Sequence, residues 1–266
     1  MIELRNITKS YPVNQGRHYI FRDVSLVIPS RVNIAVLGPN GAGKSTFLRL
    51  ISGAEAADSG TIICHSQVSW SLGLSSGFKG ALTGRQNVTF VCDINGLSRN
   101  ATDEVTRQVM DFAEIGEYFD MPINTYSSGM RARLSFGLSM AFDFDVYLVD
   151  ELTSVGDIIF REKAKAAFEK IRKRASLIYV SHNLKSLAKS CQSALFIRDG
   201  IVNYYENIDD GIAAYTEYTR ERRNHGEVKS RKEKRVSRQL RKMMKARGKD
   251  RNAANIQPEE SRNTTL

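Results

Sequence analysis

The sequence predicts an α/β fold with a phosphate-binding loop, a largely parallel-sheet core and a helical subdomain. Two short apolar runs, 146–149 and 177–180, are typical of strands buried on both faces of a parallel sheet. Residues 161–174 are rich in Lys, Ala and Glu and have the pattern of an amphipathic helix, so strands and helices alternate. The largely helical block 84–144 is predicted to be inserted into that core or appended to it.

The segments around the loop follow from local patterns. Alternating apolar residues within 2–7 and 24–28 predict two strands ahead of it. A helix is predicted over 43–53, ending at a glycine. Apolar residues on both sides of Asp199 and Gly200 predict a hairpin with a two-residue turn.

Nine consecutive residues form a complete phosphate-binding loop between a predicted strand and a predicted helix. Its glycines let backbone N–H groups approach phosphate oxygens, and the helix N-terminus adds a partial positive charge. Lys44 supplies a mobile cation for the terminal phosphates, and the Ser45 hydroxyl suits the coordination shell of Mg²⁺. A tight glycine turn is the plainer alternative, but so many matching features favour binding of a nucleoside triphosphate. The expected nucleotide-binding residues are Gly38, Pro39, Asn40, Gly41, Ala42, Gly43, Lys44, Ser45 and Thr46.

Two acids follow the predicted strand 146–149 directly. In phosphate-loop ATPases an acid at this place holds Mg²⁺, which is the role expected for Asp150. A second acid beside it can orient or deprotonate the attacking water, which is the role expected for Glu151. A pair of helix-capping acids is the alternative, but Lys44 and Ser45 elsewhere in the sequence favour the functional interpretation.

His182 follows the predicted strand 177–180 after one serine. A single histidine is more often structural than functional. This one lies at the carboxyl end of a core strand, where ligands gather in open α/β sheets, so we count it with Glu151 and Lys44 as a candidate catalytic residue.

Taken together, these motifs resemble the nucleotide-binding subunit of an ABC transporter, a phosphate-loop ATPase. The resemblance implies a RecA-like parallel-sheet core, an N-terminal antiparallel β portion and a helical subdomain. In that family a signature, most often Leu-Ser-Gly-Gly-Gln, precedes the acid-bearing strand and binds the ATP of the partner subunit. Here residues 126–131 hold that place, with Ser127 and Gly129 as matching positions. The same spacing also predicts a capped helix start, and both roles can hold together.

Two further positions match this family, whereas a glutamine that the family carries is absent. Asp157 lies where the resemblance implies the aspartate of the D-loop, and Tyr11 where it implies an aromatic ring stacked on adenine, with Tyr19 as a rival. An exposed strand tyrosine is the plainer interpretation of Tyr11. The glutamine that the family carries at the end of the strand before the helical subdomain is absent from 72–74.

A narrower resemblance is to the ATPase subunits of capsular polysaccharide exporters, with O-antigen exporters close behind, and it covers roughly residues 1–219. It implies a homodimer with two ATP molecules, Mg²⁺ held by Ser45 and Asp150, Glu151 as general base and His182 against the γ-phosphate. It also implies a multi-span membrane permease docked around 70–95, polysaccharide export, and a peripheral position on the cytoplasmic face of the inner membrane. The segments that carry this resemblance are 69–73, 77–78, 82–88, 126–131 and 155–157.

The basic charge is concentrated in a predicted tail, residues 220–266. Its stretch 220–251 holds 15 Lys and Arg against 4 Asp and Glu, whereas 1–219 is neutral overall. A solvated, partly helical or disordered extension is one interpretation, and contact with anionic lipid is another. Nucleic acid is less favoured because no aromatic side chain is interleaved with the basic residues of 220–251.

Composition excludes several classes of protein. No apolar run approaches the length of a membrane span, and the first residues lack a signal-peptide pattern. Three widely separated cysteines fit neither a disulfide framework nor a metal site, so we expect reduced thiols in a cytosolic protein. The alternative function is a soluble ABC-type ATPase that acts on ribosomes or nucleic acid through its tail. A single ATPase domain, without long coiled-coil insertions, favours transport.

Overall fold

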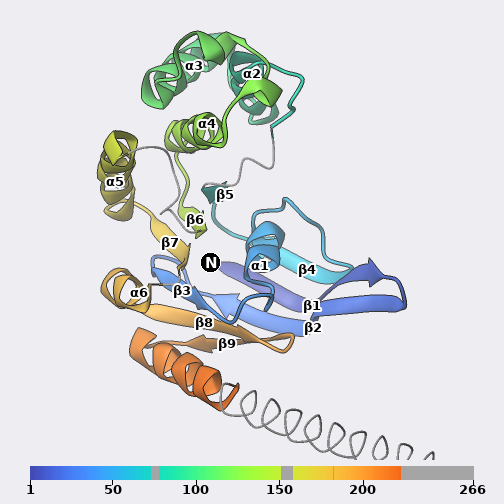
Figure 1. Ribbon diagram of the computed structural model, residues 1–266. Helices are drawn as coiled ribbons and strands as arrows, with labels where there is room; N and C mark the ends of the chain where they lie inside the picture. Colours follow the sequence, from blue (N-terminus) through green and yellow to red (C-terminus); the bar gives the residue numbers. More distant parts are fainter. Residues whose placement is uncertain (73–77, 151–157, 182, 223–266) are drawn as a thin grey trace, which may run out of the picture. The chain divides into compact units, whose positions relative to one another are not determined.

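The computed structural model describes residues 1–72, 78–150, 158–181 and 183–222 (Figure 1). It divides into two compact units, Met1–Tyr215 and Thr216–Leu266. Most of the predicted basic tail, from residue 223 onward, lies outside the described residues.

A six-stranded sheet forms the centre of the first unit, in the order β5-β6-β7-β3-β8-β9. All neighbouring pairs are parallel except β8 and β9, which form the predicted hairpin. Its two turn residues, Asp199 (φ 48°) and Gly200 (φ 81°), both adopt the left-handed conformation that such a turn requires. The strands are β3 (Ile34–Leu37), β5 (Val68–Leu72), β6 (Val146–Asp150), β7 (Ser176–Val180), β8 (Ser193–Arg198) and β9 (Ile201–Tyr205).

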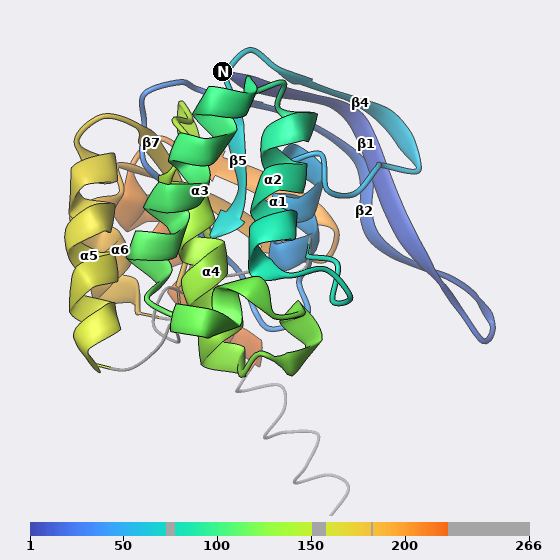
Figure 2. The same ribbon diagram turned by 90° about the horizontal axis from the view of Figure 1, so that it is seen from above.

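The predicted antiparallel portion is a separate three-stranded sheet in the order β2-β1-β4. Its strands are β1 (Ile2–Val13), β2 (Gly16–Ile28) and β4 (Ser59–Cys64). The far end of the β1–β2 ribbon projects beyond the helices (Figure 2). Strand β4 was not predicted, because its side chains are mostly exposed and it begins with Ser59 and Gly60.

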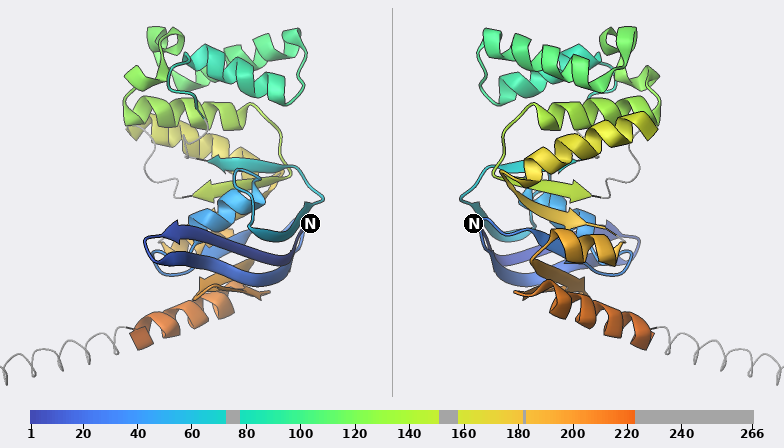
Figure 3. Two further views of the ribbon diagram at one scale, coloured as in Figure 1. Left: turned by 90° about the vertical axis from the view of Figure 1, so that its right-hand side faces the viewer. Right: turned by 90° about the vertical axis from the view of Figure 1, so that its left-hand side faces the viewer.

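Helix α1 (Lys44–Ile51) lies between the two sheets, within the main hydrophobic core (Figure 3). The predicted span 43–53 is thus slightly too long. The helix ends at Ile51, and Gly53 follows in the left-handed conformation (φ 72°). Phe47 and Leu48 of α1 are almost completely buried, and each contributes roughly 2 to 3 kcal/mol of transfer free energy.

The block predicted to be helical contains α2 (Gly84–Ile94), α3 (Arg99–Ala113), the 3₁₀ turns η1 (Gly116–Asp120) and η2 (Ile123–Thr125), and α4 (Ser128–Met140). Thr83, Ser98 and Ser127 cap the three α-helices through their hydroxyl groups. This block has its own hydrophobic core, to which Trp70 of β5 adds its ring. The single tryptophan therefore packs inside, and its Nε1 donates to Ser139 Oγ at 2.6 Å.

Two further helices of the first unit are α5 (Ile158–Arg172), which confirms the predicted helix there, and α6 (Leu184–Ser190). Another helix covers 208–222. Phe112, Phe136 and Phe160 form an aromatic cluster that joins α3, α4 and α5. No helix among the described residues is long and apolar enough to cross a membrane. All three cysteines carry free thiols.

Candidate nucleotide-binding site

The phosphate loop connects β3, which ends at Leu37, to α1, which begins at Lys44 (Figure 1). The first bond of the helix runs from Phe47 N to Gly43 O at 2.8 Å, and Ala42 N donates to Pro39 O at 3.1 Å within the loop. The N-terminus of α1 therefore opens onto the loop, as the sequence predicted. A helix N-terminus placed in this way directs backbone N–H groups toward a bound anion.

Two glycines of the loop leave no room for a Cβ: at Gly38 it would lie 2.5 Å from the backbone oxygen of Ile197, and Gly43 is packed against β2. The φ of Gly43 is +100°, and a Cβ built there would lie 2.4 Å from Ile20 Cγ2 and 3.1 Å from the ring of Phe21. Gly41 has a similar φ of +80°, but a Cβ there would meet nothing within 4 Å. Only at Gly43 does close packing against β2 add to the conformational requirement for glycine.

We therefore expect Gly43→Ala to weaken both folding and nucleotide binding. The clash and the left-handed φ should lower the free energy of unfolding by about 2 to 4 kcal/mol. Gly41→Ala, which introduces the unfavourable φ without a clash, should lower the free energy of unfolding by about 1 kcal/mol. Urea unfolding of the two variants checks this difference, and equal losses would contradict the packing argument.

Lys44 extends back along the loop. Its Nζ donates to the carbonyl oxygens of Gly38 at 2.7 Å and Pro39 at 3.0 Å. The ammonium group is thus held directly over the loop, where the sequence predicted a cation for the terminal phosphates. A phosphate group of a bound nucleotide can take these carbonyls' place as the acceptor.

Ser45 and Asp150 are brought together, as predicted. Ser45 Oγ donates to Asp150 Oδ2 at 3.2 Å, which joins the first turn of α1 to the carboxyl end of β6. A hydroxyl and a carboxylate at this distance are hard oxygen ligands that suit Mg²⁺, which also keeps several water ligands. The donor set therefore fits the predicted cation. Among the described residues, no group of three or more His, Cys, Asp or Glu side chains is arranged to hold a metal ion.

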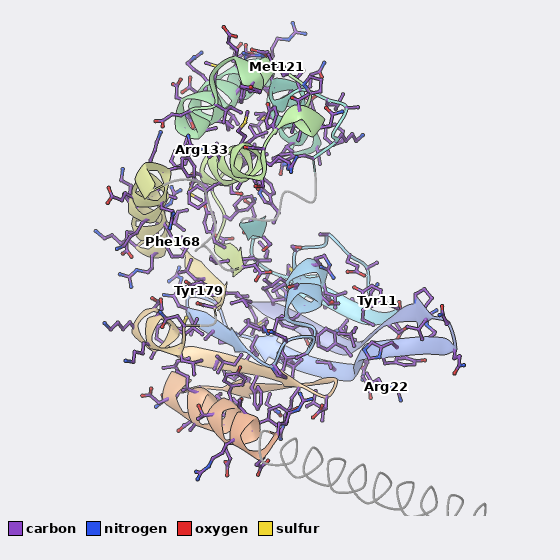
Figure 4. All side chains as sticks on the ribbon, viewed as in Figure 1. Tyr11, Arg22, Met121, Arg133, Phe168 and Tyr179 are labelled. Atoms are coloured by element: carbon purple, nitrogen blue, oxygen red, sulfur yellow. The ribbon has the colours of Figure 1, made fainter. Side chains whose placement is uncertain are left out.

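Tyr11 lies on β1 (Figure 4). Its hydroxyl lies close to Thr46, the last residue of the phosphate loop. The distance from Tyr11 Oη to Thr46 Oγ1 is 3.4 Å. Its rival Tyr19 is 40% exposed, and the guanidinium carbon of Arg22 lies 4.0 Å from its ring centroid. Of the two, Tyr11 is the aromatic residue that contacts the nucleotide-binding loop.

Sequence reasoning missed the residues that hold the Tyr11 hydroxyl. It donates to Glu55 Oε2 at 2.9 Å and accepts from Arg49 Nη2 at 3.2 Å. Burial alone would raise the pKa of Glu55, but hydrogen bonds from Lys9, Arg49 and Tyr11 lower it to about 2. No local motif indicates this contact, because 44 positions separate Glu55 from Tyr11.

Because the pKa of Glu55 is lowered in the folded state, the stability of the fold depends on pH. The folded value lies below the ordinary value of 4.5, so the stabilisation is present above pH 4.5 and is lost as pH falls toward 2. After allowance for partial exposure, we expect the free energy of unfolding to fall by on the order of 2 kcal/mol over this pH range. This pH dependence should be absent from Glu55→Gln. Urea unfolding of both proteins between pH 6 and about 2.5 measures it. Exposed Glu117→Gln serves as the control, and an unchanged acid response in Glu55→Gln would contradict the assignment.

The signature positions lie at the start of α4. Ser127 is exposed, and its hydroxyl accepts from Met130 N at 3.2 Å, which confirms the predicted helix cap. A Cβ on Gly129 would meet only Ser127 Oγ, at 3.8 Å, so the space above this helix end is open. Ser127 and Gly129 belong to the helical block, whereas the phosphate loop belongs to the core (Figure 1).

Three predicted site residues, Glu151, Asp157 and His182, lie outside the described residues. The same is true of 73–77, next to the place of the missing glutamine. The strands that precede Glu151 and His182 in the sequence are described. Strand β6 ends at Asp150 and β7 ends at Val180, and the two strands are parallel neighbours in the sheet.

Comparisons with known proteins agree with this geometry. The ABC transporter family profile matches residues 21–154. The chain is 50% identical to the polysialic acid transport ATP-binding protein KpsT of Escherichia coli, over 82% of this chain and 97% of the relative. It is 39% identical to the capsule polysaccharide export ATP-binding protein CtrD of Neisseria meningitidis serogroup B, over 81% and 98%.

Among solved structures, the fold is similar to that of the ATP-binding cassette MJ0796 in a dimeric post-hydrolysis state bound to ADP and Pi. The TM-score is 0.63 at 20% sequence identity, covering 78% of this chain and 99% of that one. At this level of identity the likeness concerns the fold, a parallel-sheet core with an antiparallel sheet and a helical block.

Proposed function

The chain belongs to the ABC transporter family, and we propose that it is the ATP-hydrolysing subunit that powers export of a capsular-type polysaccharide through a separate membrane-spanning subunit. The observation that carries this proposal is the phosphate loop beside the Ser45–Asp150 pair, in a chain half identical to a polysialic acid transport protein. The same similarity favours export over action on ribosomes or nucleic acid.

In the proposed reaction, different residues of the core bind the phosphates, the adenine and the cation. Lys44 and the backbone of the phosphate loop bind the β- and γ-phosphates, and Tyr11 stacks on the adenine. Ser45 and Asp150 would hold Mg²⁺, which when bound neutralises charge on the phosphates. Glu151 accepts a proton from the attacking water and His182 contacts the γ-phosphate, by resemblance to the family.

A second copy of the chain would complete the site. The exposed N-terminus of α4, with Ser127 and Gly129, would close on the ATP held by the phosphate loop of the partner, and Asp157 would lie at the dimer contact. The similar cassette MJ0796 has been solved as a dimer, which supports this arrangement. ATP binding would then close the dimer, and hydrolysis would reopen it.

We place the protein at the cytoplasmic face of the inner membrane, with the helical block and the region 70–95 docked on two permease subunits. Exposed apolar side chains on this block, among them Phe90 and Ile94, support a protein contact there. The basic stretch 220–251 would add attraction to anionic lipid, about 1 kcal/mol for each basic residue at the surface.

A genetic replacement tests the proposal. In a strain that lacks the gene, surface polysaccharide should be lost and should return with the wild-type chain but not with Lys44→Ala. Surface staining measures the polysaccharide outside the cell, and extraction of the cells measures the polymer that remains inside. Normal surface polysaccharide in the strain that lacks the gene would contradict the export function.

A further inference from the structure

The hydroxyl of Tyr11 is fixed from three sides. It donates to Glu55 Oε2, accepts from Arg49 Nη2, and lies 3.4 Å from Thr46 Oγ1. Arg49 Nη2 also donates to Thr46 Oγ1, at 3.2 Å. Because Thr46 closes the phosphate loop and Arg49 belongs to α1, the phenol connects strand β1 to the element that binds phosphate.

Glu55 is the centre of this cluster. Its Oε2 accepts from Arg49 Nε and its Oε1 lies against Lys9 Nζ, both at 2.9 Å. The side chain of Lys9 is only 11% exposed, and its Nζ lies 5.4 Å from the ring centroid of Tyr11. Partly buried, multiply hydrogen-bonded charges hold a geometry more firmly than surface ion pairs do.

The backbone beside Tyr11 is held by the loop that carries Glu55. Asp58 N donates to Thr8 O at 2.8 Å, and Asp58 Oδ2 accepts from Ser10 N at 2.9 Å. This carboxylate also accepts from the Ser10 hydroxyl and from Arg17 Nη2. Asp58 therefore continues the β1–β4 ladder past its last pair, and the strand is fixed directly before Tyr11.

We propose that Glu55, together with Arg49 and Lys9, positions the Tyr11 ring against the base of the bound nucleotide. The loop between α1 and β4 then sets how much the base contributes to affinity, while the phosphate loop sets the contribution of the triphosphate. This inference rests on the proposed function, because it requires that Tyr11 contacts the base.

Two probes separate these contributions. ATP carries both base and triphosphate, whereas inorganic tripolyphosphate carries the phosphates alone. Isothermal titration of both probes, each with Mg²⁺, gives an affinity ratio that reports the base contact. A general loss of stability would move both affinities together, so thermal unfolding of each variant is recorded beside the ratio.

Separate variants test the contributions of the Tyr11 ring, the Tyr11 hydroxyl and the Glu55 carboxylate to this affinity ratio. Tyr11→Ala should weaken ATP binding about tenfold and leave tripolyphosphate unchanged. Glu55→Gln and Tyr11→Phe should each lower the ratio about threefold, and the double variant should be no worse than either, because the two groups act through one contact. Glu3→Gln removes a carboxylate that pairs with Arg5 on the same strand, and it should leave the ratio unchanged.

Each contrary result has a separate meaning. If Tyr11→Ala lowers the ratio but Glu55→Gln does not, the positioning role is overturned and the base contact stands. If Tyr11→Ala leaves the ratio unchanged, the premise about Tyr11 fails, and the inference fails with it. If the wild-type chain binds neither probe, the proposed function itself is wrong.

Discussion

Replacing Lys44 by alanine is expected to abolish ATP turnover and to weaken ATP binding strongly. The Lys44 ammonium group already lies over the loop, 2.7 Å from Gly38 O, and no other cation from the loop itself can serve the terminal phosphates. Charge-assisted hydrogen bonds to phosphate strengthen as charge develops in the transition state. We expect kcat/KM to fall by about 100-fold or more.

Phosphate release and titration with ATP measure the two effects. Lys189→Ala, which removes an exposed lysine on α6, is the matched control and should behave as the wild type does. Turnover within about threefold of the wild-type rate in Lys44→Ala would contradict the phosphate-binding role.

Glu151→Gln should separate binding from chemistry. The amide keeps the shape of the side chain but cannot accept a proton, so the attacking water would lose the general base that we propose for it. Turnover should fall by about 100-fold or more, while ATP affinity stays within about threefold. The variant should therefore trap the ATP-bound dimer, which size-exclusion chromatography with Mg²⁺ and ATP detects.

Two further variants make the test of Glu151 more specific. Glu162→Gln changes an exposed carboxylate on α5 and should hydrolyse ATP normally. Asp150→Asn should instead raise the Mg²⁺ concentration needed for half-maximal activity, because Asp150 lies against Ser45 Oγ. Wild-type hydrolysis by Glu151→Gln would remove Glu151 from the role of general base.

Local chemistry determined the parts of the fold that the sequence predicted. The apolar run that became β6 is buried along its length, and the predicted turn at Asp199 and Gly200 has the expected left-handed backbone. The cap at Ser127 follows from the same kind of local rule. Edge strand β4 and the short helix α6 escaped prediction because their patterns are brief and largely polar.

For the site, motifs predicted the side chains that lie at the phosphate loop but not those that hold the Tyr11 hydroxyl. Lys44, Ser45 and Asp150 stand at positions fixed by the ends of strands and helices, so spacing alone was enough to find them. The contacts of Glu55 with Tyr11 and Lys9 join segments that are distant in the chain. Such pairings depend on how β1 packs beside α1, which a single sequence does not reveal.

Purification from native membranes in mild detergent, with the copurifying proteins identified, shows whether the chain works with a membrane-spanning subunit. The wild-type chain and Glu151→Gln are compared in parallel. We expect a multi-span membrane subunit in stoichiometric amount, and ATPase activity of the wild-type complex that responds to added polysaccharide. Recovery of ribosomes or nucleic acid, with the chain largely absent from membranes, would contradict the export function and favour a role for the basic tail in binding RNA.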